Sequence, residues 1–344
     1  MKKNQLNDNL TNFDKQSLRD RIIKSADQAK AKKRNQRILM AAASIVLLIG
    51  ASIFFQSESE TTIENFVESS PNLDVKKAEG VTLILGSGDN LNLDGNSTTV
   101  HYSNTGEEVV LSTGETVNQK STQDNRPLYN TILVPFGKRT DLKLSDGSMV
   151  WLNSGSKLVY PAVFNGKTRE VYLEGEAIFE VTHNPNKPFK VLSANQEIEV
   201  LGTVFNVSSY KEDALNFTVL KSGSVEINYN DKNIESIKIK PGTLASYNSN
   251  SKKALTQKVN VNDYFSWRDG FLNFKNDDLK FIMTKLSRYY DVEIVIDENG
   301  LAEQTFSGNL DLKDNVEKII SLIAETSNFK VTYKEGIIQL NNSN

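Results

Sequence analysis

The stretch DLKLSDGSMVWL, residues 141–152, predicts two short strands joined by a tight turn. Apolar and polar residues alternate on both sides of the turn, and this period of two is typical of a strand with one buried face. The pair Asp146-Gly147 between the two runs favours a hairpin, because both residue types tolerate the backbone angles of such turns. We therefore expect a β-hairpin here.

The same pattern extends over residues 81–255, where short alternating runs are separated by turn residues. The turn pairs include Asn165-Gly166, Ser222-Gly223 and Pro241-Gly242. Further strand-like runs occur at 81–85, 169–173, 197–201, 215–220, 225–227 and 237–239. Many short strands at close spacing predict an all-β body, either a sandwich or an elongated solenoid.

A faint internal repeat links the start of this body to the hairpin at 141–152. Leu83, Leu85, Gly88, Leu93 and Ser97 align at one offset, without gaps, with Leu142, Leu144, Gly147, Leu152 and Ser156. Leucine and glycine also match by chance in β-rich sequence, so both interpretations stay open. A real repeat would make the strands from Val81 part of the same β architecture.

A second repeat closes the chain and predicts a small α+β domain. Apolar residues recur at helical spacing twice, and an alternating strand-like run follows each set. The two sets are Leu279, Ile282, Met283 and Leu286, and then Val316, Ile319, Ile320 and Ile323. Two strand-helix-strand units from Phe271 to Leu340, with both helices buried on one sheet, follow from this pattern.

An apolar run near the amino terminus predicts a membrane anchor. Residues 38–55, ILMAAASIVLLIGASIFF, are eighteen positions without a charge, and as a helix they span about 27 Å. Basic residues crowd the preceding side and acidic residues the following side, which places the amino terminus in the cytoplasm. The alternatives are a cleaved signal peptide, which needs a small-residue cleavage site, and a buried core helix.

The segments on either side of the run are polar. In residues 1–37, Phe13, Leu18, Ile22 and Ala26 recur at roughly helical spacing, which indicates either a partner-binding stripe or a solvated helix. Residues 56–80 are acidic and rich in Ser and Thr, so we expect a flexible spacer.

Composition excludes several function classes. A net charge of -3 without a basic stripe beyond the run gives no sign of direct nucleic-acid binding, and the chain has no cysteine for thiol chemistry. The two histidines, His101 and His183, lie in turn-rich sequence and predict surface residues rather than a metal site. Glu174 and Glu176 share one strand face and could form a hydrolytic pair, but alternation along a half-exposed strand gives the same pattern, so we set the hydrolase hypothesis aside. We expect no enzyme activity and no cofactor.

Several motifs in the β body resemble the FecR family of transmembrane regulators. The run from Leu144 to Ser156 is similar to the family segment L-D-G-T-x-V-W-L-N-x-x-S, and the later family motifs follow in order. These later motifs are 172–181, 187–189, 200–207, 223–226 and 240–242. The part from Trp267 to Ile338 resembles the domain that follows in Bacteroidetes-type members, itself similar to the short amino-terminal domain of secretins and TonB-dependent receptors.

The resemblance implies a membrane-anchored protein with one transmembrane helix, an all-β periplasmic domain and a small α+β domain made of duplicated βαβ units. The implied parts are a cytoplasmic tail for sigma-factor contact (1–37), the transmembrane helix (38–55), the spacer (56–80), a β-rich lead-in (81–128), the FecR-like domain (129–255) and the secretin/TonB-like domain (267–344). The bulk of the chain would then lie in the periplasm, on the outer side of the inner membrane.

The resemblance also implies a function and partners. Such regulators control an extracytoplasmic-function sigma factor on the cytoplasmic side, here through the short tail with Phe13, Leu18 and Ile22. The signal comes from the periplasmic signalling domain of a TonB-dependent outer-membrane transporter. A membrane-tethered carbohydrate-binding protein and a structural envelope protein are the alternatives.

The motif residues are predicted to determine the fold rather than to contact a ligand. Glycines provide turns and close backbone approaches, and aromatic residues provide apolar anchors. These residues are Asp146, Gly147, Trp151, Leu152, Asn153, Gly175, Glu176, Pro188, Phe189, Gly202, Phe205 and Trp267. We expect Trp267 to pack where the β body meets the terminal domain.

Overall fold

The computed structural model divides the chain into two units, Met1–Glu60 and Thr61–Asn344, which are described separately. It describes residues 16–28, 30, 32, 39, 40, 43, 45, 62–71, 73–93, 100–103, 105–111, 114–119, 127–297, 299–327 and 329–342.

In the first unit, residues 16–28 form a helix on which Leu18 and Ile22 are exposed. Phe13 of the predicted stripe lies outside the described residues. Within the part of the chain that is described, none of the helices combines the length and the apolar character that a membrane crossing requires. Most of residues 38–55 lie outside that part, so the membrane anchor stays a prediction.

The second unit begins with a helix where the sequence predicts a flexible spacer, and for the residues described between 62 and 80 that prediction is wrong. Helix α2 (Ile63–Ser69) is followed by the 3-10 turn η1 (Val75–Lys77). Ile63 is completely buried against the β body. Ile63, Phe66 and Val67 form an apolar stripe at helical spacing, which the acidic composition of this segment conceals.

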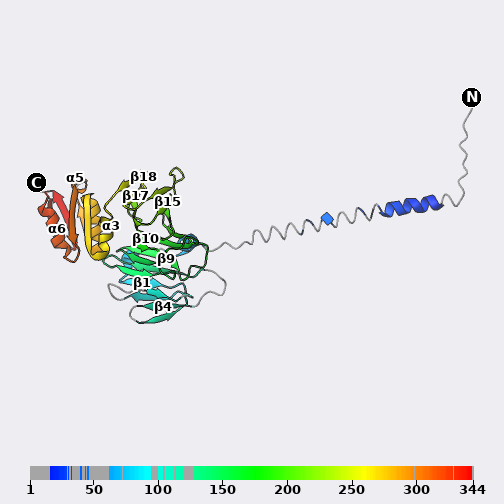
Figure 1. Ribbon diagram of the computed structural model, residues 1–344, viewed down its shortest axis with the longest axis horizontal. Helices are drawn as coiled ribbons and strands as arrows, with labels where there is room; N and C mark the ends of the chain where they lie inside the picture. Colours follow the sequence, from blue (N-terminus) through cyan, green and yellow to red (C-terminus); the bar gives the residue numbers. More distant parts are fainter. Residues whose placement is uncertain are drawn as a thin grey trace, which may run out of the picture. The chain divides into compact units, whose positions relative to one another are not determined.

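The β body is one 18-stranded sheet that folds into two layers (Figure 1). The first layer runs in the order β2 (Asn90–Leu93), β1 (Val81–Ile84), β6 (Tyr129–Val134), β9 (Ser156–Pro161), β10 (Arg169–Glu180), β11 (Phe189–Leu192), β12 (Gln196–Val200), β15 (Val225–Tyr229) and β16 (Ile237–Ile239). The β10–β11 pair is parallel, and the other pairs of this layer are antiparallel.

The second layer runs in the order β5 (Thr116–Asn118), β4 (Glu108–Leu111), β3 (Val100–Tyr102), β7 (Thr140–Lys143), β8 (Met149–Leu152), β10, β13 (Val204–Ser209), β14 (Leu215–Ser222), β17 (Thr243–Asn248) and β18 (Lys253–Lys258). Side chains of both layers form one apolar core, with Leu83 and Ile132 from the first layer and Leu142 and Phe205 from the second. The body is therefore a sandwich.

Strand β10 belongs to both layers, and Gly175 marks the crossing. Residues up to Glu174 pair with β9 in the first layer, and residues from Gly175 onward pair with β13 in the second. Gly175 has a φ of +116°, and a Cβ atom there would lie 2.6 Å from the Cα of Ser156. Only glycine fits this backbone angle and this close approach.

The faint repeat is confirmed in local structure. The turns of the β1–β2 and β7–β8 hairpins have the same pair of hydrogen bonds. In the first turn Leu85 N donates to Asp89 O and Gly88 N donates to Leu85 O. In the second turn Leu144 N donates to Ser148 O and Gly147 N donates to Leu144 O. The β4–β5 hairpin repeats this turn at Leu111 and Gly114. The lead-in strands therefore belong to the β body rather than to a linker.

The terminal domain follows α3 (Asn262–Phe265) and the 3-10 turn η2 (Ser266–Asp269). Its elements are β19 (Phe271–Asp278), α4 (Leu279–Tyr290), β20 (Glu293–Ile296), α5 (Asn299–Ala302), β21 (Thr305–Asp311), α6 (Val316–Glu325), β22 (Phe329–Lys334) and β23 (Ile337–Asn342). The predicted apolar faces of α4 and α6 are both buried in one core separate from that of the β body. Asp278 and Asn315 cap the two helices.

The sheet arrangement of this domain differs from the predicted single sheet. The first strands of the two units pair with each other as β19–β21, whereas the strands after the helices form a separate sheet, β20–β23–β22. The duplication is visible in the helices, but pairing between units rather than within them splits the strands into two sheets.

Candidate functional site

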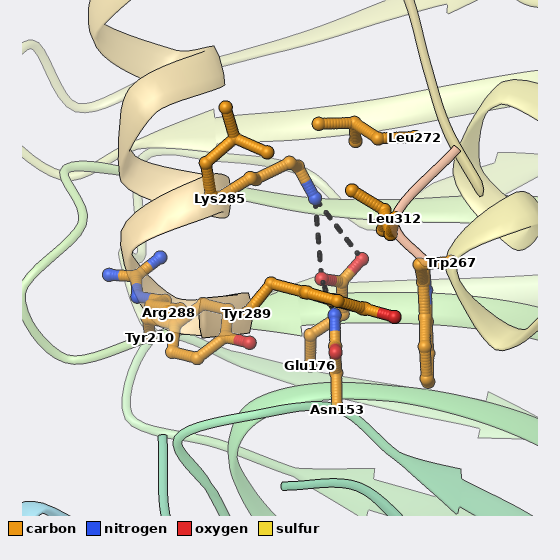
Figure 2. Close-up of a pocket in the computed structure, with 10 residues that line it drawn as sticks. Asn153, Glu176, Tyr210, Trp267, Leu272, Lys285, Arg288, Tyr289 and Leu312 are labelled. Carbon is orange, nitrogen blue, oxygen red and sulfur yellow. Dashed lines mark hydrogen bonds and ion pairs between the residues drawn. The ribbon is translucent and has the colours of Figure 1, made fainter. Parts of the chain in front are cut away.

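A buried glutamate lies where the β body meets the terminal domain. Glu176 on β10 is 1% exposed. Asn153 Nδ2 donates to its Oε2 at 2.9 Å, and Asn206 Nδ2 donates to its Oε1 at 3.3 Å. Lys285 Nζ on α4 lies 3.3 Å and 3.5 Å from the same two oxygens. Figure 2 shows the lysine reaching this carboxylate. A buried carboxylate requires such partners, and one of them comes from the other domain.

The crossing of β10 positions this carboxylate. Glu176 directly follows Gly175, and its N–H donates to Ser156 Oγ at 2.9 Å while its carbonyl accepts from Ser156 Oγ and from Asn153 N. Glu174, the other member of the suggested carboxylate pair, instead forms an ion pair with Lys157 at 2.7 Å. The two carboxylates thus have different partners and do not form a hydrolytic pair.

A second ion pair joins the domains beside the first. Arg288 on α4 donates from both terminal nitrogens to the carboxylate of Asp213, each at 2.7 Å. Its guanidinium lies 3.8 Å from the ring centroid of Tyr210. Burial raises the pKa of Tyr210 well above its ordinary value, and its neutral hydroxyl donates to Ser154 O at 2.9 Å. Bidentate geometry makes this the stronger kind of ion pair.

The turn before β7 contacts the same end of α4. Gly137 N donates to Arg288 O at 2.9 Å, and the guanidinium of Arg139 lies 4.0 Å from the ring centroid of Tyr289. Burial lowers the pKa of Arg139, although the neighbouring tyrosines oppose this effect. These contacts add a backbone hydrogen bond and a cation–π contact to the two ion pairs.

An apolar cluster completes the junction. Trp267 on η2 is 5% exposed and belongs to a cluster with Ile178, Phe217, Val219, Leu244 and Phe265. Arg268, the next residue, lies 5.1 Å from the ring centroid of Trp151. The structure therefore places Trp267 at the junction, packed on the outer face of the second layer.

A cavity of about 20 Å³ lies inside the junction, enough for about one water molecule. It is lined by Asn153, Glu176, Tyr210, Trp267, Leu272, Lys285, Leu286, Arg288, Tyr289 and Leu312 (Figure 2). The indole N–H of Trp267 is buried and has no hydrogen-bond partner among the residues that the structure describes. A water molecule in the cavity would supply an acceptor for it.

The remaining motif residues lie inside the β body. Asp146, next to the hairpin residue Gly147 (φ +84°), accepts from the completely buried Arg169 at 2.7 Å. Arg169 N also donates to the carbonyl of Pro188. Gly202 passes so close to His183 that a Cβ atom would lie 2.6 Å from the His183 Cα.

Aromatic and aliphatic motif residues form the core of the sandwich. The rings of Phe205 and Phe179 stack with centroids 5.2 Å apart, and Phe189 lies 6.2 Å from Phe179. Leu152 is completely buried beside them in the same core. Three of the twelve motif residues, Asn153, Glu176 and Trp267, line the junction cavity.

Sequence reasoning missed the partners that complete the junction, namely Asn206, Tyr210, Asp213, Lys285 and Arg288. Lys285 and Arg288 occupy polar positions of an amphipathic helix, where solvent exposure is the usual outcome. His101 and His183 are exposed, as predicted. Among the described residues, no group of three or more His, Asp or Glu side chains could hold a metal ion.

Within the described residues, a large β sandwich is joined through two ion pairs to a small α+β domain. The chain contains two domains of the FecR family. The family model described as FecR protein matches residues 130–226, and the model described as FecR, C-terminal, matches residues 271–340.

Two solved structures are similar to this chain. Both are crystal structures of a candidate anti-sigma factor from Parabacteroides distasonis ATCC 8503 and are 28% identical in sequence. One covers 62% of this chain and 99% of its own with a TM-score of 0.59, and the other covers 63% and 100% with a TM-score of 0.60. No match was found among curated proteins.

Proposed function

We propose that this chain is a single-span inner-membrane regulator of an extracytoplasmic-function sigma factor. The supporting observation is the pair of FecR-family domains in sequence, together with the similarity to the candidate anti-sigma factor of P. distasonis. In this proposal the amino-terminal tail contacts the sigma factor, residues 38–55 cross the membrane, and the second unit receives a signal in the periplasm.

The transporter side of the proposal rests on the junction. A signal from the periplasmic signalling domain of a TonB-dependent transporter must bias an equilibrium between two states of the receiver. Two ion pairs join the β body to the terminal domain, and a small cavity lies between them. A partner that contacts both domains, or that competes for α4, would change this equilibrium by its differential affinity for the two states.

Topology is tested with reporter fusions. A reporter that is active only in the periplasm is expected to be active when fused after Asn344 and silent when fused after Lys15, because the basic flank stays on the cytoplasmic side. Deletion of residues 38–55 should silence the first fusion, since the second unit would no longer be exported. The opposite pattern of activity would rule out this orientation.

Sigma-factor binding is tested on the exposed stripe of the tail. Leu18 is 54% exposed and Ile22 60% exposed, and we expect the double variant Leu18→Asp, Ile22→Asp to abolish co-purification of the sigma factor with the chain. Moving two carboxylates into an apolar groove costs several kcal/mol, about 3 or more.

The matched control is the double variant Gln16→Asp, Gln28→Asp, which adds the same charge to the helix outside the stripe. It should retain most of the binding. If both double variants bind like the wild type, the sigma factor does not use the helix at 16–28, and the tail has another role.

A further inference from the structure

Helix α2 covers an apolar patch on the outer face of the first layer. Ile63 is completely buried there, in a cluster with Tyr129 on β6, Val159 on β9 and Leu192 on β11. The ring of Phe66 lies 5.1 Å from that of Tyr129, and Val67 and Tyr172 pack around them. The patch faces away from the sandwich core, so without α2 it would be exposed to solvent.

The helix is too short to exist without this contact. It has seven residues, whereas isolated helices below about 12–15 residues are marginal in water. Its amino-terminal cap is weak, because Asn65 N donates to Thr62 Oγ1 at 3.3 Å. Docking and helix formation are therefore one event, and α2 has two states: helical on the β body, or unfolded away from it.

Undocking changes the distance that residues 63–69 can span. As a helix, seven residues span about 10 Å, and fully extended they span about 23 Å. Residues 63–69 lie between the apolar run at 38–55 and the first strand of the β body. Release of α2 therefore lengthens the connection between these two parts of the chain by roughly 13 Å.

We propose that α2 is a releasable clamp that couples the β body to the membrane segment, docked in the resting state and undocked when the periplasmic signal arrives. The proposal rests on the proposed function, because it assumes that residues 38–55 cross the membrane.

The docked state is tested by amide hydrogen exchange on the full chain in phosphatidylglycerol/phosphatidylethanolamine vesicles. Phe66→Asp should accelerate exchange of residues 63–69 at least tenfold, because a carboxylate replaces the ring against Tyr129, while β6 and β9 keep their protection. Asn65→Asp adds the same charge at an exposed position of the helix and should leave exchange unchanged. Equal exchange in the two variants would overturn the docking.

The role in signalling is tested by locking the helix. The chain has no cysteine, so Phe66→Cys with Tyr129→Cys provides a unique pair for a short bis-methanethiosulfonate cross-linker that reductant removes. The cross-linked cells should lose the transcriptional response to the transporter substrate, and reductant should restore it. The reference for this loss is the same double-cysteine variant treated with a monofunctional methanethiosulfonate, which carries the same substitutions without the link.

Failure of the clamp and failure of the proposed function give different results. A locked variant that responds like the wild type overturns the clamp while the regulator stands. A wild-type chain that changes no transcript on addition of substrate overturns the proposed function, whatever the exchange at residues 63–69 shows.

Discussion

Gly175→Ala is expected to destabilise the β body by about 4 kcal/mol, a large share of the stability of a typical domain. The φ of +116° strains any residue with a Cβ atom, and this atom would also meet the backbone of Ser156 at 2.6 Å. Because Ser156 Oγ hydrogen-bonds both the N–H and the carbonyl of Glu176, a shift of Ser156 should also displace Glu176 at the junction. Urea denaturation of the purified chain measures the loss.

Gly242→Ala is the matched control for this substitution. Gly242 also has a left-handed backbone angle, with φ of +81°, but no atom of the described part of the chain lies within 4 Å of the position of a Cβ there. Only the strain of about 1–2 kcal/mol applies. Equal losses for the two variants would show that the layer crossing tolerates a side chain at Gly175.

Lys285→Met is expected to loosen the terminal domain from the β body by about 3 kcal/mol, because it leaves the carboxylate of Glu176 buried without its cation. Exchange of amide hydrogens in β19 and α4 should accelerate, whereas the strands distant from the junction keep their protection. Under the proposed function, this variant should also alter the transcriptional response to the transporter substrate.

A double-mutant cycle separates the ion pair from general packing. Glu176→Gln combined with Lys285→Met removes both charges, and we expect it to recover part of the loss, because no buried charge is left without its partner. The amide oxygen can still accept from Asn153 Nδ2, whereas the amide nitrogen cannot accept from Asn206 Nδ2. Lys280→Met, at an exposed position of the same helix, should have little effect. A double variant no better than Lys285→Met alone would contradict the pairing.

Much of the local structure could be predicted from the sequence. The hairpin at 141–152, the repeated turns at Gly88 and Gly147, and the buried faces of α4 and α6 follow from period, spacing and turn residues. The helix α2 was predictable in principle from the stripe Ile63, Phe66 and Val67, but an acidic composition suggested a spacer. In that segment, three apolar residues are enough to form a helix because they pack on an apolar patch of the β body.

The candidate site could be predicted only in part. Asn153, Glu176 and Trp267 belong to motifs quoted from the sequence, but no pattern connects them with Lys285 or with the Arg288–Asp213 pair. Charged residues on the polar face of a helix carry the same pattern whether they meet solvent or another domain. Only the packed structure shows that Lys285 meets the buried Glu176 and that Arg288 pairs with Asp213 of the β body.

The sequence alone determined the strands that alternate most clearly, such as those on either side of the turn at Asp146-Gly147, and the apolar faces of α4 and α6. These properties depend on neighbours only a few positions away. The sequence also predicts the membrane segment from hydropathy alone. The tertiary structure decided which layer each strand joins, that β10 changes layer at Gly175, and that the terminal domain docks through Glu176 and Asp213. These features depend on contacts between residues far apart in the sequence, 109 positions for Glu176 and Lys285. Such contacts are set by the packing of whole elements, which leaves no local period in the chain.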